Sequence, residues 1–121
     1  MSTPITIVDD SSLSRKLMIK ALPPDWGVEI TQASNGVEAL DAYRAGKAHV
    51  MFLDLTMPVM DGYKVLEHLK HEGLNSFVIV VSADIQPKAQ ERVQSLGAIA
   101  FLKKPVSTEQ VAKVLKDYGI L

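Results

Sequence analysis

Short, continuously apolar runs alternate along this chain with longer segments of helical periodicity, and this alternation constrains the fold most strongly. Residues 50–53 and 77–81 contain no polar side chain. Strands without polar alternation are typical of a parallel sheet that is covered by helices on both faces. Parallel neighbours also need a crossover helix between them. The sequence therefore predicts a doubly wound α/β fold with five parallel strands and five helices.

The turn and capping signals divide the chain into these elements. The expected strands cover residues 5–8, 28–33, 50–53, 77–81 and 98–102. The expected helices are residues 11–22, a helix from the Asn35 and Gly36 turn to Gly46, one from Asp61 and Gly62 to Gly73, residues 87–97, and one after a capping box of Ser107 and Gln110. The side chains expected on the core-facing stripes of the first two helices are Leu13, Leu17 and Leu22, then Val37, Leu40 and Tyr43.

Composition limits the classes of protein to which the chain can belong. Its 121 residues suit one domain, residues 1–121, and we expect no attached output domain. The 13 basic and 14 acidic residues give no basic field for nucleic acid or anionic lipid. Cysteine is absent, and no apolar run reaches the roughly 20 residues that span a bilayer. We expect a soluble, cytoplasmic monomer that binds neither nucleic acid nor membrane.

Polar residues follow the expected strands at their carboxyl ends. Asp9 and Asp10 follow the first strand, Asp54 the third, Ser82 the fourth and Lys104 the fifth. In an open α/β sheet the functional crevice lies beyond these strand ends. Each residue alone has a simpler interpretation, such as a helix N-cap for Asp10 or a surface charge for Lys104. The combination of all five is far more specific than any of its members.

The residue types in this group indicate phosphoryl chemistry. Three adjacent carboxylates repel one another unless a cation lies between them. Oxygen ligands without His or Cys favour Mg²⁺, which also leaves room for phosphate oxygens. Asp54 would then be the nucleophile that forms an acyl phosphate, while Ser82 and Lys104 neutralise the phosphoryl oxygens. His49, His68 and His71 are expected to be surface residues and not metal ligands.

Four segments carry a resemblance to a known family. They are residues 8–11 (VDDS), 53–62 (LDLTMPVMDG), 81–83 (VSA) and 101–105 (FLKKP). The chain resembles the receiver domain of bacterial two-component response regulators, most of all the single-domain chemotaxis CheY type. The resemblance covers essentially the whole chain. It implies a flavodoxin-like sheet with the strand order 2-1-3-4-5.

The resemblance assigns the metal and the phosphoacceptor. It implies that Asp54 accepts a phosphoryl group from the phosphohistidine of a histidine kinase. Asp10 and Asp54 would ligate Mg²⁺ directly, together with the main-chain carbonyl of Thr56, and Asp9 would assist through water. The chain would catalyse only its own phosphorylation and dephosphorylation, so it is not an enzyme acting on other substrates.

The resemblance also assigns a switch. Lys104, directly before Pro105, matches the family's lysine, and Ser82 takes the hydroxyl position that hydrogen-bonds the phosphoryl group. Phe101 takes the aromatic switch position, where chemotaxis members commonly carry Tyr. A downstream target such as a flagellar motor switch protein would read the switch, and a phosphatase is a further partner.

Two residues are expected to tune the lifetime of the phosphoryl group. Thr56 lies two residues after the acceptor, and Asp84 lies two residues after Ser82. Both are small and polar enough to admit and orient the water that attacks the acyl phosphate. Substitution by a large basic side chain, Thr56→Arg or Asp84→Lys, is expected to slow self-dephosphorylation.

Three alternatives stay open at this point. A phosphatase of the haloacid dehalogenase class also uses Asp and Mg²⁺, but it requires a second Asp where Thr56 stands. A pseudo-receiver would act as an interaction module without phosphorylation, although such domains usually lose an acidic residue or the lysine. A phosphotransfer relay would pass the group onward, and its sequence would look the same as that of a target-binding switch.

Overall fold

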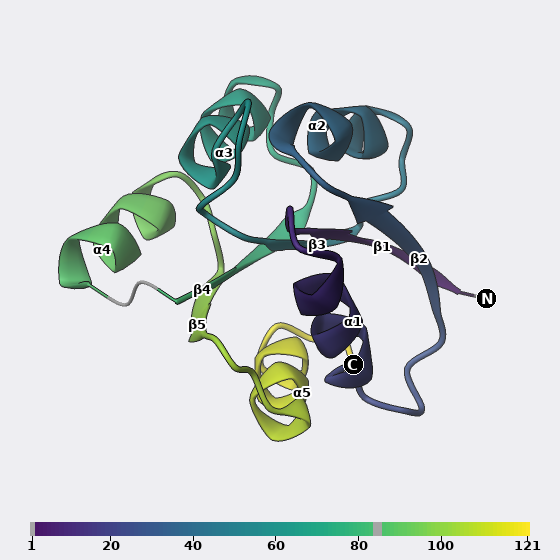
Figure 1. Cartoon of the computed structure of the whole chain (residues 1–121). Coiled ribbons are helices and arrows are strands. Elements are labelled where there is room, and N and C mark those ends of the chain that lie inside the picture. Colours follow the sequence, from purple (N-terminus) through teal and green to yellow (C-terminus); the bar gives the residue numbers. More distant parts are fainter. Residues whose placement is uncertain (1, 84–85) are drawn as a thin grey trace.

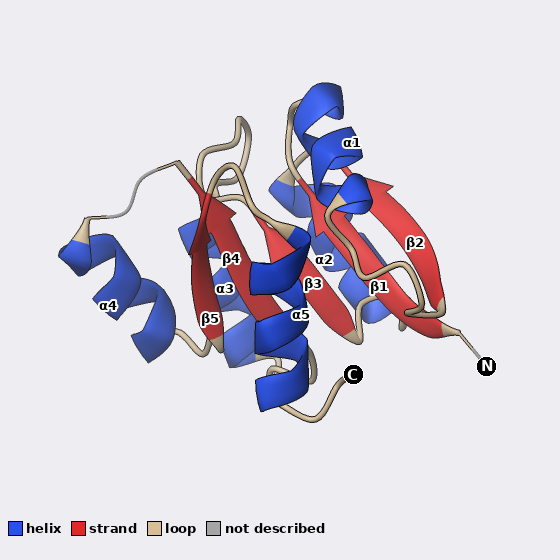
Figure 2. Cartoon of the chain, turned by 90° about the horizontal axis from the view of Figure 1, so that it is seen from below, coloured by secondary structure: helices blue, strands red, loops and turns tan. Residues whose placement is uncertain are grey.

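The computed structural model describes residues 2–83 and 86–121, which form a sheet enclosed by helices (Figure 1 and Figure 2). The strands are β1 (Thr3–Val8), β2 (Val28–Ala33), β3 (Val50–Leu53), β4 (Phe77–Ser82) and β5 (Ala100–Lys103). The helices are α1 (Ser12–Lys20), α2 (Gly36–Arg44), α3 (Gly62–His71), α4 (Pro87–Ser95) and α5 (Thr108–Asp117). All strand pairs are parallel, in the order β2-β1-β3-β4-β5. The predicted fold class and strand order are confirmed.

The helices cover the two faces of the sheet in separate layers. Figure 1 shows α1 and α5 on one face and α2, α3 and α4 on the other. Each layer has its own apolar core, and the central strand β3 contributes to both: Met51 and Leu53 to one, Val50 and Phe52 to the other. Burial on both faces explains why β3 lacks any polar position.

Local capping explains where four of the helices begin. The side chains of Ser11, Asn35 and Asp61 each accept a hydrogen bond from the backbone N–H three residues later. Ser107 and Gln110 form the predicted capping box of α5, with both reciprocal hydrogen bonds present. Ser11 is therefore the N-cap of α1, and Asp10 is free for another role.

The predicted core residues of the first helix were wrong at Leu13 and Leu17 and correct at Leu22. Leu13 and Leu17 are 65% and 54% exposed, whereas Met18, Ala21 and Leu22 are buried. Leu17 and Met18 differ by one residue, which is roughly 100° around a helix. The sheet therefore buries the neighbouring face of α1, and Leu13 and Leu17 face solvent.

Two smaller differences concern α2 and β5. Val37 was expected in the core but is 45% exposed in the first turn of α2, while Leu40 is buried as predicted. The fifth strand begins at Ala100 and not at Ala98. The backbone N–H of Ala98 donates to the carbonyl of Val93, so Ala98 caps the carboxyl end of α4 and does not join the sheet.

The helices are too short to cross a bilayer. The longest described helices, α3 and α5, have 10 residues each, and none in the described part of the chain combines the length and apolar character of a membrane span.

Candidate functional site

The strand register brings Asp9 and Asp54 together at the carboxyl edge of the sheet. Val8 of β1 pairs with Leu53 of β3, and each of these residues is followed directly by one of the two aspartates. The backbone N–H of Asp54 donates to the carbonyl of Val8 at 3.0 Å. Two residues 45 positions apart in the sequence thus become neighbours because their strands are parallel and in register.

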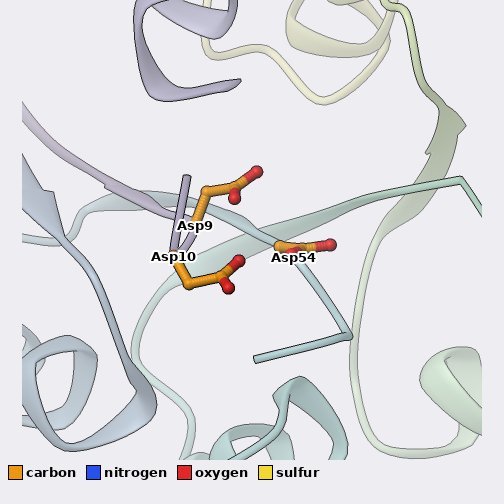
Figure 3. Close-up of side chains that lie close together, drawn as sticks. All are labelled: Asp9, Asp10 and Asp54. Atoms are coloured by element: carbon orange, nitrogen blue, oxygen red, sulfur yellow. The ribbon is translucent and has the colours of Figure 1, made fainter. Parts of the chain in front are cut away.

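Three carboxylates gather at this edge, as Figure 3 shows. One oxygen from each of Asp9, Asp10 and Asp54 lies within 4.8 Å of the other two. Asp9 and Asp54 are buried, each with 6% exposure, and Asp10 is exposed. Within residues 2–83 and 86–121, this is the only group of three or more His, Cys, Asp or Glu side chains arranged to hold a metal ion.

Lys104 reaches this acidic group from the end of β5. Its Nζ lies 2.6 Å from Asp9 Oδ2 and 3.6 Å from Asp54 Oδ1. The backbone N–H of Lys104 donates to the carbonyl of Ser82 at 2.9 Å, which anchors the lysine beside the end of β4. The five residues that the sequence analysis grouped therefore lie together at one edge of the sheet.

Burial controls the protonation of the central carboxylate. Burial raises the pKa of Asp54 from 3.8 to about 6; the charge of Lys104 opposes this rise, and Asp9 and Asp10 add to it. Burial also acts to lower the pKa of Lys104, but its hydrogen bond to Asp9 and the charge of Asp54 outweigh it, so this pKa is raised. One ammonium group therefore leaves the three carboxylates incompletely neutralised. A divalent cation with oxygen preference fits such a donor set.

One proposed switch residue, Ser82, lies beside this group, and the other, Phe101, lies on the neighbouring strand β5. Ser82 ends β4 and is 2% exposed. Phe101 lies on β5, opposite Val80 of β4, and is partly buried against the core beneath α3 and α4.

Thr56 is exposed in the loop after β3. Asp84, which was expected to tune dephosphorylation, lies outside the described residues.

Two residues, Gly62 and Arg15, contact the site in ways that the sequence did not predict. Gly62 begins α3, and its backbone N–H donates to Leu55 at 2.9 Å, directly after Asp54. Arg15 of α1 donates from Nη1 to the main-chain carbonyl of Asp9 at 2.6 Å. The only sequence signal for Arg15 is an arginine one turn into a helix, which ordinarily indicates a solvated side chain. His49, His68 and His71 are exposed, as expected.

The fold and the edge geometry define a class: a parallel α/β domain with an acidic pocket and a lysine at the carboxyl ends of its strands. A family model described as response regulator receiver domain matches residues 5–116. This chain belongs to the response regulator receiver domain family. Receiver domains are signalling modules of two-component systems.

Known proteins with similar sequences place the family in several contexts. A protein-glutamate methylesterase/protein-glutamine glutaminase 1 from Oleidesulfovibrio alaskensis is 33% identical over 93% of this chain, which spans only 32% of that protein. The polar-differentiation response regulator DivK from Brucella anthropi is 30% identical, with 98% of this chain and 97% of DivK covered.

A solved structure of similar fold carries ligands. The CheX-CheY-BeF3-Mg+2 complex from Borrelia burgdorferi has a chain that matches with a TM-score of 0.87 and 27% identity, covering 98% of this chain and 90% of that one. These neighbours differ in biological pathway although they share the domain.

Proposed function

We propose that this domain accepts a phosphoryl group on Asp54 from the phosphohistidine of a histidine kinase and thereby changes its binding to a target protein. The observation that carries the proposal is the position of Asp54 between Asp9, Asp10 and Lys104, with Lys104 Nζ 3.6 Å from its Oδ1. A carboxylate between a cation and a metal-binding acidic pair is suited to attack phosphorus.

The chain's oxygen ligands suit Mg²⁺. Asp10 and Asp54 would bind it directly with the main-chain carbonyl of Thr56, and Asp9 would assist through water. Their carboxylate oxygens already lie within 4.8 Å of one another. When bound, Mg²⁺ neutralises charge on phosphoryl oxygens and offsets the mutual repulsion of the carboxylates.

The transfer itself is a displacement at phosphorus. An Asp54 oxygen forms the new P–O bond while the P–N bond of the phosphohistidine breaks, and the imidazole nitrogen leaves with its electron pair. Lys104 offers positive charge beside the acceptor, and the Ser82 hydroxyl donates to a phosphoryl oxygen. These residues hold the reacting groups in place, which is the principal requirement of phosphoryl transfer.

The output is a packing change that starts at the phosphoryl group. Ser82 moves toward the phosphoryl group and Phe101 fills the space that it leaves. Phe101 is only partly buried on the edge strand β5, so an inward rotation has room to alter the surface formed by α4, β5 and α5. Phe101→Ala is expected to keep phosphorylation and to weaken binding of the target.

Dephosphorylation depends on access of water to Asp54. Thr56 is exposed in the loop that follows the acceptor, so its side chain can gate this path. We assign the same role to Asp84. Thr56→Arg and Asp84→Lys should prolong the lifetime of the acyl phosphate, measured by the release of inorganic phosphate.

The relatives of the chain support two candidate pathways. The first is a place in chemotaxis, in which the chain acts as a cytoplasmic, monomeric receiver domain with a flagellar motor switch protein as target and a phosphatase as a further partner. The match to CheY in the complex with CheX supports this role. The similarity to DivK, a response regulator named for polar differentiation, favours a second candidate, a phosphotransfer or signalling role outside chemotaxis.

The decisive experiment is labelling with a small phosphodonor. Wild-type protein incubated with acetyl phosphate and Mg²⁺ should gain one labile phosphoryl group by mass spectrometry, and Asp54→Asn should gain none. EDTA should abolish the labelling. Unchanged labelling of Asp54→Asn would refute the acceptor, and an unlabelled wild-type protein would favour the pseudo-receiver. The relay is supported if the labelled protein passes its phosphoryl group to a histidine phosphotransfer domain.

A further inference from the structure

Arg15 contacts the acidic pocket through the backbone and not through a carboxylate. Its Nη1 donates to the main-chain carbonyl of Asp9 at 2.6 Å, and its Nε donates to Gln32 Oε1 of β2 at 2.8 Å. Within the described part of the chain, no carboxylate oxygen lies within ion-pairing distance of Arg15. Arg15 therefore binds a main-chain carbonyl and a side-chain amide although three carboxylates lie nearby. Such contacts fix the orientation of the backbone and do not neutralise the carboxylates.

The carbonyl that Arg15 holds belongs to the peptide bond between Asp9 and Asp10. Because the peptide unit is planar, a hydrogen bond that fixes this oxygen also fixes the direction in which the chain enters Asp10. The Asp9 carboxylate is held separately, by the backbone N–H of Ser11 at 2.9 Å and by Lys104 Nζ at 2.6 Å.

Asp10 has no comparable support of its own. Its side chain is exposed, and among residues 2–83 and 86–121 it has no hydrogen-bond or ion-pair partner. The direction of its carboxylate therefore depends on the backbone that Arg15 holds. Substitution of a group that orients a metal ligand commonly weakens metal affinity by roughly tenfold or more.

We propose that Arg15, itself held by Gln32, is a positioning residue that orients the Asp9–Asp10 peptide and thereby presents the Asp10 carboxylate to Mg²⁺. This inference rests on the proposed function, because it needs the acidic pocket to bind the metal. It also gives the edge strand β2 a part in the site, since Gln32 lies on that strand.

A positioning role and a purely electrostatic role of Arg15 predict opposite changes in Mg²⁺ affinity for Arg15→Ala. Arg15 is a cation near a cation site, so if its charge dominated, Arg15→Ala would tighten Mg²⁺ binding by removing repulsion. If Arg15 positions Asp10, the same substitution weakens Mg²⁺ binding. Gln32→Ala changes no charge but releases Nε of Arg15, so only positioning predicts a weakened affinity for this variant.

The test is isothermal titration of the whole chain with Mg²⁺ alone, for wild type, Arg15→Ala, Arg15→Lys and Gln32→Ala. We expect Kd to rise roughly tenfold for Arg15→Ala, and less for Arg15→Lys and Gln32→Ala. Labelling by acetyl phosphate should recover toward the wild-type rate when Mg²⁺ is saturating, because the chemical step keeps Asp54 and Lys104.

A matched control is Arg44→Ala, which breaks a bidentate pair with Glu72 on the far side of the domain. Its Mg²⁺ affinity should equal that of wild type. Equal or tighter Mg²⁺ binding by Arg15→Ala and Gln32→Ala, with wild-type binding intact, would overturn the positioning role alone. A wild-type protein that does not bind Mg²⁺ would overturn this proposal and the proposed function together. If Arg15→Ala fails to fold, Gln32→Ala and Arg15→Lys decide the question.

Discussion

Gly62 shows how closely α3 packs on the strand that leads into Asp54. A Cβ at this position would lie 2.5 Å from the carbonyl oxygen of Asp54 and 2.8 Å from the Cα of Leu55. Both contacts are with backbone, which cannot rotate away as a flexible side chain can. Glycine is therefore required for the approach of the helix and not for an unusual φ.

Gly62→Ala should displace the first turn of α3 from Asp54. We expect a loss of about 1–3 kcal/mol in the free energy of unfolding, measured by urea denaturation, and slower labelling by acetyl phosphate. Gly46→Ala is the control, because Gly46 has a φ of 75° but no atom near its Cβ position. It should lose stability without any change in labelling. A Gly62→Ala protein as stable as wild type would contradict this packing argument.

The raised pKa of Asp54 makes the stability of the metal-free protein depend on pH. Its pKa is about 6 in the folded chain, against an ordinary value of 3.8. The folded state thus binds more protons than the unfolded state between these values. Protonated Asp54 therefore stabilises the folded state fully below about pH 4, and this stabilisation is lost as the pH rises through about 6.

The measurement compares wild type with Asp54→Asn in EDTA. The free energy of unfolding of wild type, relative to that of the variant, should fall by on the order of 1–2 kcal/mol between about pH 4.5 and about pH 7.5. The amide does not titrate, so the comparison removes contributions from histidines and other groups. A difference that does not change with pH would show that Asp54 titrates normally.

At the scale of elements, α4 is attached to α3 by side chains as well as by the core. The guanidinium of Arg92 lies 4.0 Å from the centroid of the Tyr63 ring and 3.4 Å from Glu67. Lys70 of α3 donates to the carbonyl of Ser95 at the end of α4 at 3.0 Å. Because Tyr63 is the second residue of α3, this contact links α4 to the helix that packs on Asp54.

Arg92→Ala should loosen α4 without disturbing the acidic pocket. We expect faster amide hydrogen exchange in α4, corresponding to a loss of about 0.5–1 kcal/mol, because the cation–π contact is removed. Glu67→Gln should have a smaller effect, since the side chains of the Arg92–Glu67 pair are 54% and 52% exposed. Equal effects of the two substitutions would mean that the ring contact contributes nothing.

At the scale of the whole molecule, the acidic pocket opposes folding in the absence of metal. Asp10→Ala should weaken Mg²⁺ binding and raise the stability of the metal-free protein by on the order of 1 kcal/mol, since one of three repelling carboxylates is removed. Mg²⁺ at ten times its Kd should stabilise wild type by about 1.4 kcal/mol through mass action. Thermal melting with and without Mg²⁺ tests both effects, and a melting temperature unmoved by millimolar Mg²⁺ would contradict them.

Short-range patterns were enough to predict most elements. Residues 50–53 are apolar throughout, and β3 has the predicted bounds because burial on both faces leaves no polar position. The Ser107 and Gln110 capping box also formed, since both hydrogen bonds are made within one helical turn. The prediction that Leu13 and Leu17 are buried was wrong. Two leucines at helical spacing define one face of a helix, but the packing of α1 on the sheet decides which face is buried.

The residues that gather at the acidic edge could be predicted from the sequence, because Asp9, Asp10, Asp54, Ser82 and Lys104 each follow or end a strand. Their contacts depended on the folded arrangement. Lys104 meets Asp9 across 95 residues, and Arg15 meets a backbone carbonyl that carries no sequence signal. Such contacts arise from the register of parallel strands and from helix docking, which bring together groups that no local pattern connects.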